Sequence, residues 1–244
     1  MKTKIEIAPK YSFLREVILS LPENFSNHGR IVCSEKNVIR SVVWEGILVE
    51  IKQFKYNTLV DRYWFATFGK SKAQLGYENS DRLLNLGINT PERIAYITSY
   101  KYGMLYEDFY VYLSIDYKSL DELIKLPLSS SLNALKTFAR FSFNLHSLGI
   151  FPKDYTANNI AYTLRSNEYN FVLIDNDRIS FSKFFAKKGV RNLQRLYLPA
   201  DRFSIIISEY ALKARIDGLK TLGLVLFIKR CRALISLRKI YYAN

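Results

Sequence analysis

The sequence predicts a two-lobed α+β fold, in which a β-rich N-terminal lobe carries one helix and the C-terminal lobe is α-helical. Runs of β-branched and aromatic residues dominate the first part of the chain, whereas apolar residues recur at helical spacing from Ser129 onward. Hydrophobic residues make up 49% of the 244 residues, which is enough for a substantial core. We assign residues 1–115 to the first lobe and residues 116–244 to the second, and expect the ligand site in a cleft between them.

The N-terminal lobe is expected to open with a short strand at Ile5–Ile7 and a short helix around Phe13–Leu21, which Pro22 breaks. Runs rich in β-branched residues then predict β-hairpin strands, because such side chains pack well on a pleated surface. These strands are expected at residues 31–33, 38–43 and 47–52, with a turn at Glu45-Gly46.

The spacing of apolar residues changes over residues 70–87, where Ala73, Tyr77 and Leu83 lie among charged side chains. This pattern predicts an amphipathic helix, which Gly87 and Pro91 stop. Strand character returns after it, at residues 94–99 and 109–115.

The C-terminal lobe is expected to start with a short helix within residues 116–126 and then a long helix that Gly149 ends. Two short strands follow, one from Ile160 and one over Phe171–Ile174. The rest of the lobe is predicted to contain a basic segment at residues 189–196 and helices at residues 203–215 and 220–241.

The chain carries 36 Lys and Arg residues against 22 Asp and Glu residues, a formal net charge of +14. Such an excess predicts an anionic partner, which is a nucleic acid, a membrane surface or a phosphorylated substrate. Many of the tyrosines fall in strand-like positions such as Tyr96 and Tyr110, where aromatic residues usually serve packing. We therefore do not expect a nucleic acid as the partner.

The two cysteines, Cys33 and Cys231, form no metal-ligand spacing and no disulfide framework, which is typical of a reducing cytoplasm. The N-terminus lacks the apolar core of a signal peptide. The apolar run Leu222–Ile228 is far shorter than the ~20 residues of a membrane-spanning helix. We expect a cytoplasmic protein, either soluble or peripheral on the inner face of the cell membrane.

The stretch from Leu145 to Arg178 contains an acid, an amide and a second acid in the order that phosphoryl transfer needs. Asp154 lies in a loop after the long helix and would accept the proton of the attacking hydroxyl. Asn159, five positions later, and Asp175, after the strand Phe171–Ile174, would hold magnesium. Two neighbours, Asn158 and Asp177, compete for these roles, but their spacing is less favourable.

Lys52 ends a strand of β-branched residues, where a lysine could reach the phosphates of ATP. Glu78, on the following helix, is the candidate acid that would orient it, and Lys55 is a nearby competitor for the lysine role. His146 at the end of the long helix is interpreted as a structural residue. The sequence contains no Gly-rich phosphate loop.

Three stretches together resemble the lipopolysaccharide kinase family, the Kdo and heptose kinases that are related to protein kinases. The resemblance covers roughly residues 30–215. The stretches are the strand Val49-Glu50-Ile51-Lys52-Gln53-Phe54, the helix and turn from Lys70 to Leu86-Gly87-Ile88-Asn89-Thr90-Pro91, and the catalytic stretch that ends Leu173-Ile174-Asp175-Asn176-Asp177-Arg178.

The resemblance implies a protein-kinase-like fold, ATP and Mg²⁺, and a sugar hydroxyl of lipopolysaccharide as the acceptor. It implies an ion pair between Lys52 and Glu78, Asp154 as the catalytic base, and Asn159 and Asp175 as metal ligands. The basic C-terminal residues from Lys229 to Lys239 could rest on an anionic membrane, and the segment 187–192 could hold a phosphorylated acceptor.

The chain departs from the kinase pattern in two places. Pro152-Lys153-Asp154 replaces His-Arg-Asp, and Asp175-Asn176-Asp177 replaces Asp-Phe-Gly. Three alternatives therefore stay open: a small-molecule kinase of the aminoglycoside or choline type, a pseudokinase, and a regulatory binding module.

Overall fold

The computed structural model describes residues 2–227, and the chain divides into two compact units. The first unit contains the residues up to Tyr117 together with Val172–Ile179. The second contains Lys118–Phe171 and the residues from Ser180 onward. The sequence placed all residues from 116 onward in one lobe and did not predict that Val172–Ile179 packs with the N-terminal part.

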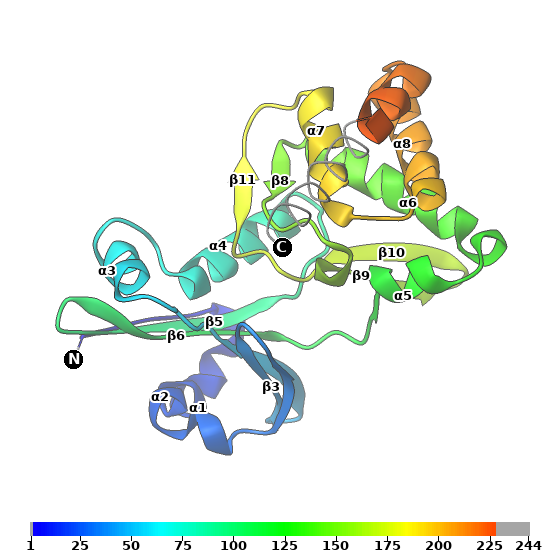
Figure 1. The fold of residues 1–244 in the computed structure, drawn as a ribbon. Helices are drawn as coiled ribbons and strands as arrows, with labels where there is room; N and C mark the ends of the chain where they lie inside the picture. The colour runs from blue at the N-terminus through cyan, green and yellow to red at the C-terminus, as the bar shows by residue number, and fades with distance from the viewer. Residues whose placement is uncertain (1, 228–244) are drawn as a thin grey trace, which may run out of the picture. The chain divides into compact units, whose positions relative to one another are not determined.

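A six-stranded sheet forms the centre of the first unit (Figure 1). Each strand pairs with its neighbours in the antiparallel direction. Its strand order is β1-β5-β6-β4-β3-β2. Glu45 and Gly46 both have positive φ, and this turn lets β3 and β4 follow the right-handed twist of the hairpin. The strands are β1 (Lys2–Ile7), β2 (Arg30–Ser34), β3 (Val38–Trp44), β4 (Ile47–Gln53), β5 (Arg93–Lys101) and β6 (Met104–Leu113).

Helices cover both faces of this sheet near β5 and β6, with α4 on one side and α1 and α2 on the other (Figure 1). Residues 94–99 of β5 are all buried, as expected for a strand covered on both faces. The helix predicted around Phe13–Leu21 is present as the short helix α1, flanked by η1 and α2, and α3 was not predicted. The elements are η1 (Pro9–Leu14), α1 (Arg15–Leu19), α2 (Leu21–Asn24), η2 (Phe25–Asn27), α3 (Leu59–Thr67) and α4 (Lys72–Asn85).

The second unit is mainly helical, with α6 packed against α8. Two small sheets accompany the helices, one with strand order β10-β9-β7 and one that pairs β11 with β8. The helices are α5 (Leu120–Lys125), α6 (Leu128–Ser147), η3 (Ala157–Asn159), α7 (Ala186–Leu193), η4 (Gln194–Leu196) and α8 (Ala200–Ala214). The strands are β7 (Lys118–Ser119), β8 (Ile150–Pro152), β9 (Ile160–Arg165), β10 (Glu168–Leu173) and β11 (Ile179–Phe181), of which the end of β10 and the start of β11 belong to the first unit.

The helix expected over residues 220–241 is described only in its first part, where residues 218–227 are helical. The basic positions from Lys229 to Lys239, and Cys231, lie outside the described residues. Within residues 2–227, no helix is long and apolar enough to cross a membrane.

Candidate active site

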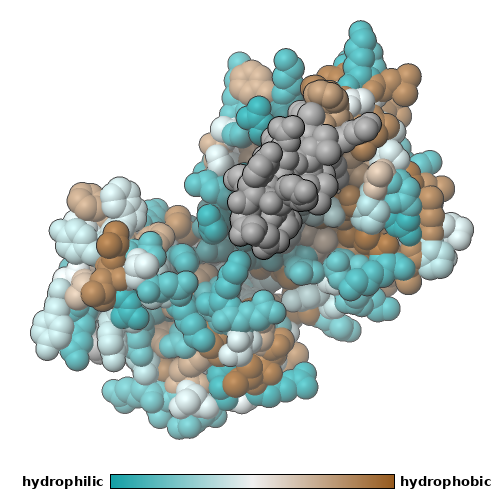
Figure 2. Space-filling view, viewed as in Figure 1, coloured by the Kyte–Doolittle hydropathy of each residue, from teal (hydrophilic) through white to brown (hydrophobic). Residues whose placement is uncertain are grey.

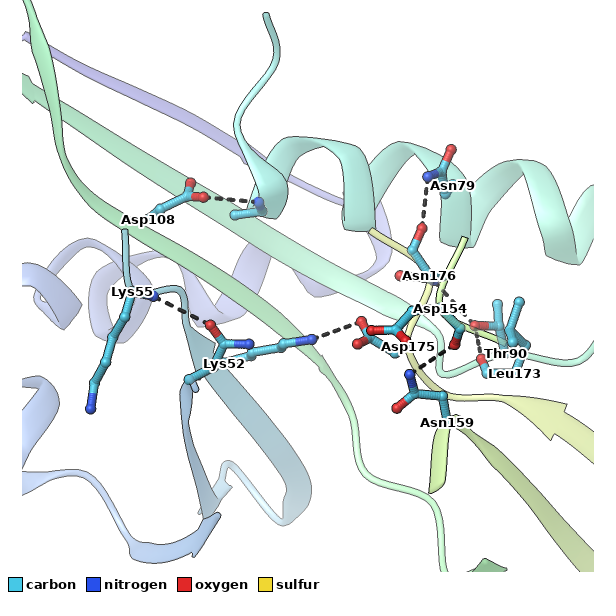
Figure 3. A network of polar contacts seen from close by, with 12 residues as sticks. Lys52, Lys55, Asn79, Thr90, Asp108, Asp154, Asn159, Leu173, Asp175 and Asn176 are labelled. Atoms are coloured by element: carbon cyan, nitrogen blue, oxygen red, sulfur yellow. Dashed lines mark hydrogen bonds and ion pairs between the residues drawn. The ribbon is translucent and has the colours of Figure 1, made fainter. Parts of the chain in front are cut away.

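Lys52 lies near the end of β4 and is almost completely buried. Its Nζ lies 2.8 Å from Oδ1 of Asp175 (Figure 3). The ammonium also lies 4.8 Å from the centre of the Phe54 ring. Lys55, the competing lysine, is exposed. The structure therefore brings together two of the predicted site residues, Lys52 and Asp175, within the first unit.

Asp175 follows a segment that is held in place by the turn after α4. The Leu173 amide donates to the Asn89 carbonyl at 3.0 Å, and the Thr90 hydroxyl donates to the Leu173 carbonyl at 2.7 Å. Asn89 and Thr90 belong to the turn that the sequence singled out after the helix. Because these bonds fix the backbone just before Asp175, they set the position of its carboxylate.

Asn176 continues this anchorage on α4 (Figure 3). The Asn79 side chain donates to the Asn176 carbonyl at 2.7 Å, and the Asn176 side chain donates to the Thr90 hydroxyl at 3.2 Å. Gly76 allows the close approach, because a Cβ at this position would lie 3.1 Å from Tyr110 and 3.4 Å from Asn176. Asn176 thus serves as a buried polar bridge at the position where protein kinases carry phenylalanine.

The charges around Asp175 favour its ionised form. Burial works against ionisation, but the Lys52 ammonium lowers the pKa of Asp175 below its usual range. Burial and the neighbouring Asp175 carboxylate raise the pKa of Asp177 well above its usual range. Asp175 is therefore the carboxylate that ionises more readily, and it is the one available to a cation.

The expected ion pair between Lys52 and Glu78 is not formed. Glu78 instead pairs with Lys70, 2.5 Å away, and accepts a hydrogen bond from Gln74 at 2.8 Å. Successive residues of a helix are rotated by about 100°, so when Gly76 and Asn79 face Asn176, Glu78 points to another side of α4. Asp175, and not Glu78, is therefore the acid that pairs with Lys52.

Asp108 on β6 anchors the start of α4 and was missed by the sequence analysis. Its buried carboxylate accepts hydrogen bonds from the Tyr56 hydroxyl at 2.6 Å, the Ala73 amide at 3.0 Å and the Thr98 hydroxyl at 2.8 Å. Burial raises the pKa of this carboxyl group. An acid directly before the apolar and aromatic run Phe109–Tyr112 was the available signal.

In the second unit, Asp154 and Asn159 belong to one tight loop. The Asn159 side-chain amide donates to the Asp154 carbonyl at 2.9 Å, and the Thr156 amide donates to the same oxygen at 3.0 Å. Because this bond uses the side-chain nitrogen of Asn159, its side-chain oxygen stays available to a ligand. Asn158 is exposed, so the loop geometry favours Asn159 over its neighbour.

His146 supports this loop from α6. It is fully buried, its ring contacts Tyr210 and Asn192 at 3.0 Å each, and Asn192 donates to the Pro152 carbonyl at 2.8 Å. Burial lowers the pKa of His146 to about 4, so the ring is neutral at physiological pH. The interpretation of His146 as a structural residue is confirmed. The hydrogen bonds from His146 through Asn192 to Pro152 support a loop that lacks the usual His before Arg-Asp.

A cavity of about 500 Å³ adjoins the loop that carries Asp154 within the second unit. Its wall includes Phe151 and Asn192 and five basic side chains. The basic residues are Lys153, Lys187, Lys188, Arg191 and Arg195, and no acidic residue lines the cavity.

The side-chain oxygens present are of the type that magnesium accepts. Among residues 2–227, no cluster of three or more His, Cys, Asp or Glu side chains could hold a metal by itself. Mg²⁺ in phosphotransfer sites is usually held by one or two protein oxygens together with substrate phosphates. The Asp175 carboxylate in the first unit and the Asn159 amide oxygen in the second unit are each a ligand of that kind.

Known structures share this arrangement of elements. The structure of WaaP in complex with acyl carrier protein matches 93% of this chain and 97% of its own, with a TM-score of 0.64 and 14% sequence identity. The chain has the protein-kinase-like fold. This confirms the predicted α+β fold class, with an antiparallel sheet in one unit and helices in the other.

Two further kinases match this kinase-like chain more distantly. The Rio2 kinase of Chaetomium thermophilum, in an ADP/Mg²⁺-phosphoaspartate complex, matches 87% of this chain and 75% of its own, with a TM-score of 0.49 and 14% identity. A PknI kinase domain of Mycobacterium tuberculosis matches 74% of each chain, with a TM-score of 0.45 and 14% identity. No protein-family model matches the chain, and no curated protein matches its sequence.

Proposed function

We propose that this protein is an ATP-dependent kinase that phosphorylates a sugar hydroxyl in the Kdo and heptose inner core of lipopolysaccharide. The observation that carries the kinase assignment is the ion pair between Lys52 and Asp175, set 2.8 Å apart on a kinase-like fold. A buried lysine and a carboxylate of low pKa are the two groups that such a fold uses to hold phosphates and metal.

Each residue has a defined task in this proposal. The Lys52 ammonium would contact ATP phosphates, while the Asp175 carboxylate and the Asn159 amide oxygen would hold Mg²⁺. The bound metal supplies positive charge that offsets the negative charge of the transferring phosphoryl group. Asp154 would accept the proton of the acceptor hydroxyl as that oxygen attacks, and the hydrogen bonds to its carbonyl keep the loop in one conformation.

The cavity beside the catalytic loop supports an anionic acceptor over a cationic one. Its five basic side chains face no acidic residue in the lining, so they would repel aminoglycosides and choline, which carry positive charge. A lipopolysaccharide inner core carries phosphate and carboxylate groups. The resemblance of the sequence to lipopolysaccharide kinases and the likeness of the fold to WaaP favour the same acceptor.

We further propose that the protein is cytoplasmic and contacts an anionic membrane at its periphery. Support comes from the outer side of α3, where Leu59, Val60 and Trp64 are exposed. Figure 2 shows apolar and weakly polar residues gathered at the left, where α3 lies. Leu59 shares one depression with two basic residues, Arg62 of α3 and Lys101 of β5. Exposed aromatic and apolar side chains beside basic ones are typical of proteins that rest on lipid headgroups.

Transfer of labelled γ-phosphate from Mg·ATP tests the acceptor assignment. Purified lipopolysaccharide, an aminoglycoside and choline are offered separately to the wild-type protein. The proposal predicts label on lipopolysaccharide alone. Label on the aminoglycoside or on choline would mean that the acceptor is a small molecule and not lipopolysaccharide. Absence of both transfer and ATP binding would instead support the pseudokinase or binding-module alternative.

A further inference from the structure

We propose that the cavity beside the catalytic loop binds an oxyanion of the acceptor, a phosphate or carboxylate group carried by the sugar next to the hydroxyl that reacts. The proposal rests on the proposed function, since it assigns the acceptor subsite of the same enzyme. A cavity of about 500 Å³ lies within the range of small-molecule sites and can take a charged sugar unit.

Three of the basic residues in the cavity lie along one side of α7 and the turn after it. Lys187 and Arg191 are four residues apart, and Arg195 follows after another four. Like charges at this spacing repel each other and reduce helix stability. Among the described carboxylates, none forms an ion pair with Lys187 or Arg191. A bound anion would relieve this repulsion.

Two of the five cations are held in place by neighbouring groups. Lys188 donates to the Ser182 hydroxyl, and its ammonium lies 4.2 Å from the centre of the Phe151 ring. Arg195 donates to the Lys153 carbonyl at 2.8 Å, which joins η4, directly after α7, to the residue before Asp154. These contacts fix part of the cavity wall before any ligand binds, so less conformational entropy is lost on binding.

The position of α7 is itself fixed from behind. A Cβ on Gly189 would lie 1.9 Å from the Tyr210 hydroxyl and 2.9 Å from Nδ1 of His146, so only glycine permits this packing. Asn192 then connects His146 to the Pro152 carbonyl. The helix that carries Lys187 and Arg191 is therefore locked to the loop that carries Asp154.

This placement assigns the oxyanion to the acceptor rather than to ATP. Lys153 lines the cavity and directly precedes the proposed base Asp154. A sugar held through its charged group would keep a neighbouring hydroxyl oriented, which is a large part of what a kinase contributes to the rate.

Direct binding of an acceptor fragment tests the subsite without turnover. The probe is the lipid-free core oligosaccharide that mild acid releases from lipopolysaccharide, titrated into the wild type, into the double variant Lys187→Gln/Arg191→Gln and into the exposed control Lys213→Gln. The double variant should bind about tenfold more weakly or worse, because two charge-assisted hydrogen bonds are lost, while the control should match the wild type. Equal affinity in all three proteins would overturn the proposal.

Chemical treatment of the probe identifies the group that is bound. Removal of its phosphates with hydrogen fluoride weakens binding if the cavity holds a phosphate, and reduction of its carboxyl groups weakens binding if it holds a carboxylate. Unchanged affinity after both treatments would contradict the proposal.

A turnover measurement on the same proteins separates this subsite from the kinase assignment. If the oligosaccharide binds as predicted but no γ-phosphate is transferred, the proposed function fails and the subsite stands. If transfer occurs and the KM for the acceptor is the same in the double variant and the wild type, the kinase assignment stands and the subsite is wrong.

Discussion

The Lys52 ammonium lies 2.8 Å from the Asp175 carboxylate, and the residue expected to orient this lysine, Glu78, pairs with Lys70 instead. In the structure, the proposed phosphate-binding lysine is therefore positioned by a proposed metal ligand. The two groups depend on each other, because the positive charge of Lys52 keeps Asp175 ionised.

Replacing Lys52 with methionine should lower kcat/KM for ATP by about 10²-fold or more, the scale of losing one fixed electrostatic contact to the reacting group. Loss of the ammonium also raises the pKa of Asp175, so the remaining activity should improve as pH rises. Steady-state kinetics between pH 6 and 9 measures both effects. Wild-type activity in Lys52→Met would remove Lys52 from the site, and Lys55→Met serves as the matched control.

The change Glu78→Gln should leave kcat within about twofold of the wild type, because the side chain forms a largely exposed ion pair with Lys70, and such pairs contribute little. The same assay, run beside Lys52→Met, checks this. A loss as large as that of Lys52→Met would show that Glu78 approaches Lys52 during turnover.

Asp154→Asn removes the proposed base but keeps the size of the side chain. The hydrogen bonds of the loop go to the Asp154 backbone carbonyl, so they should survive and the fold should be unaffected. We expect kcat to fall about 10²- to 10⁴-fold, with little change in ATP affinity. Single-turnover rates and nucleotide titrations measure the two quantities, and a matching loss of ATP affinity would argue for a binding role instead.

The buried His146 should make the protein sensitive to acid. Its pKa is lowered to about 4 by burial, so below pH 6.5 the unfolded chain takes up a proton that the folded chain does not. Stability from this residue is therefore present above pH 6.5 and is lost as pH falls towards 4. Between pH 7 and pH 5 the loss should be about 2 kcal/mol.

Urea unfolding of the wild type and of His146→Gln at these two pH values measures this contribution. The glutamine variant should show a pH dependence smaller by that amount, whatever its absolute stability. Equal pH dependence in both proteins would mean that His146 titrates normally in the folded state.

Much of the fold followed from local sequence patterns, because each pattern concerned neighbouring residues. The β-branched runs predicted β3 and β4, and the helical period over residues 70–87 predicted α4. α3 was missed because its aromatic residues do not form a clear period. The Thr58 side chain caps it through the Asp61 amide, and this spacing was the usable signal.

The site was only partly predictable, because its contacts join residues that are distant in sequence. The strand end at Lys52 and the position of Asp175 were visible as local motifs. Their pairing across 123 positions was not. The side of α4 that faces Asn176 depends on the close packing at Gly76, which a pattern of apolar residues does not reveal.

Transfer of γ-phosphate from Mg·ATP to lipopolysaccharide, compared between the wild type, Asp154→Asn and Asp175→Ala, tests the central claim most directly. The account predicts labelled glycolipid with the wild-type protein and almost none with either variant, while circular dichroism shows that all three are folded. Equal labelling by all three proteins would contradict it, because transfer would then not depend on the proposed base or on the carboxylate that Lys52 holds.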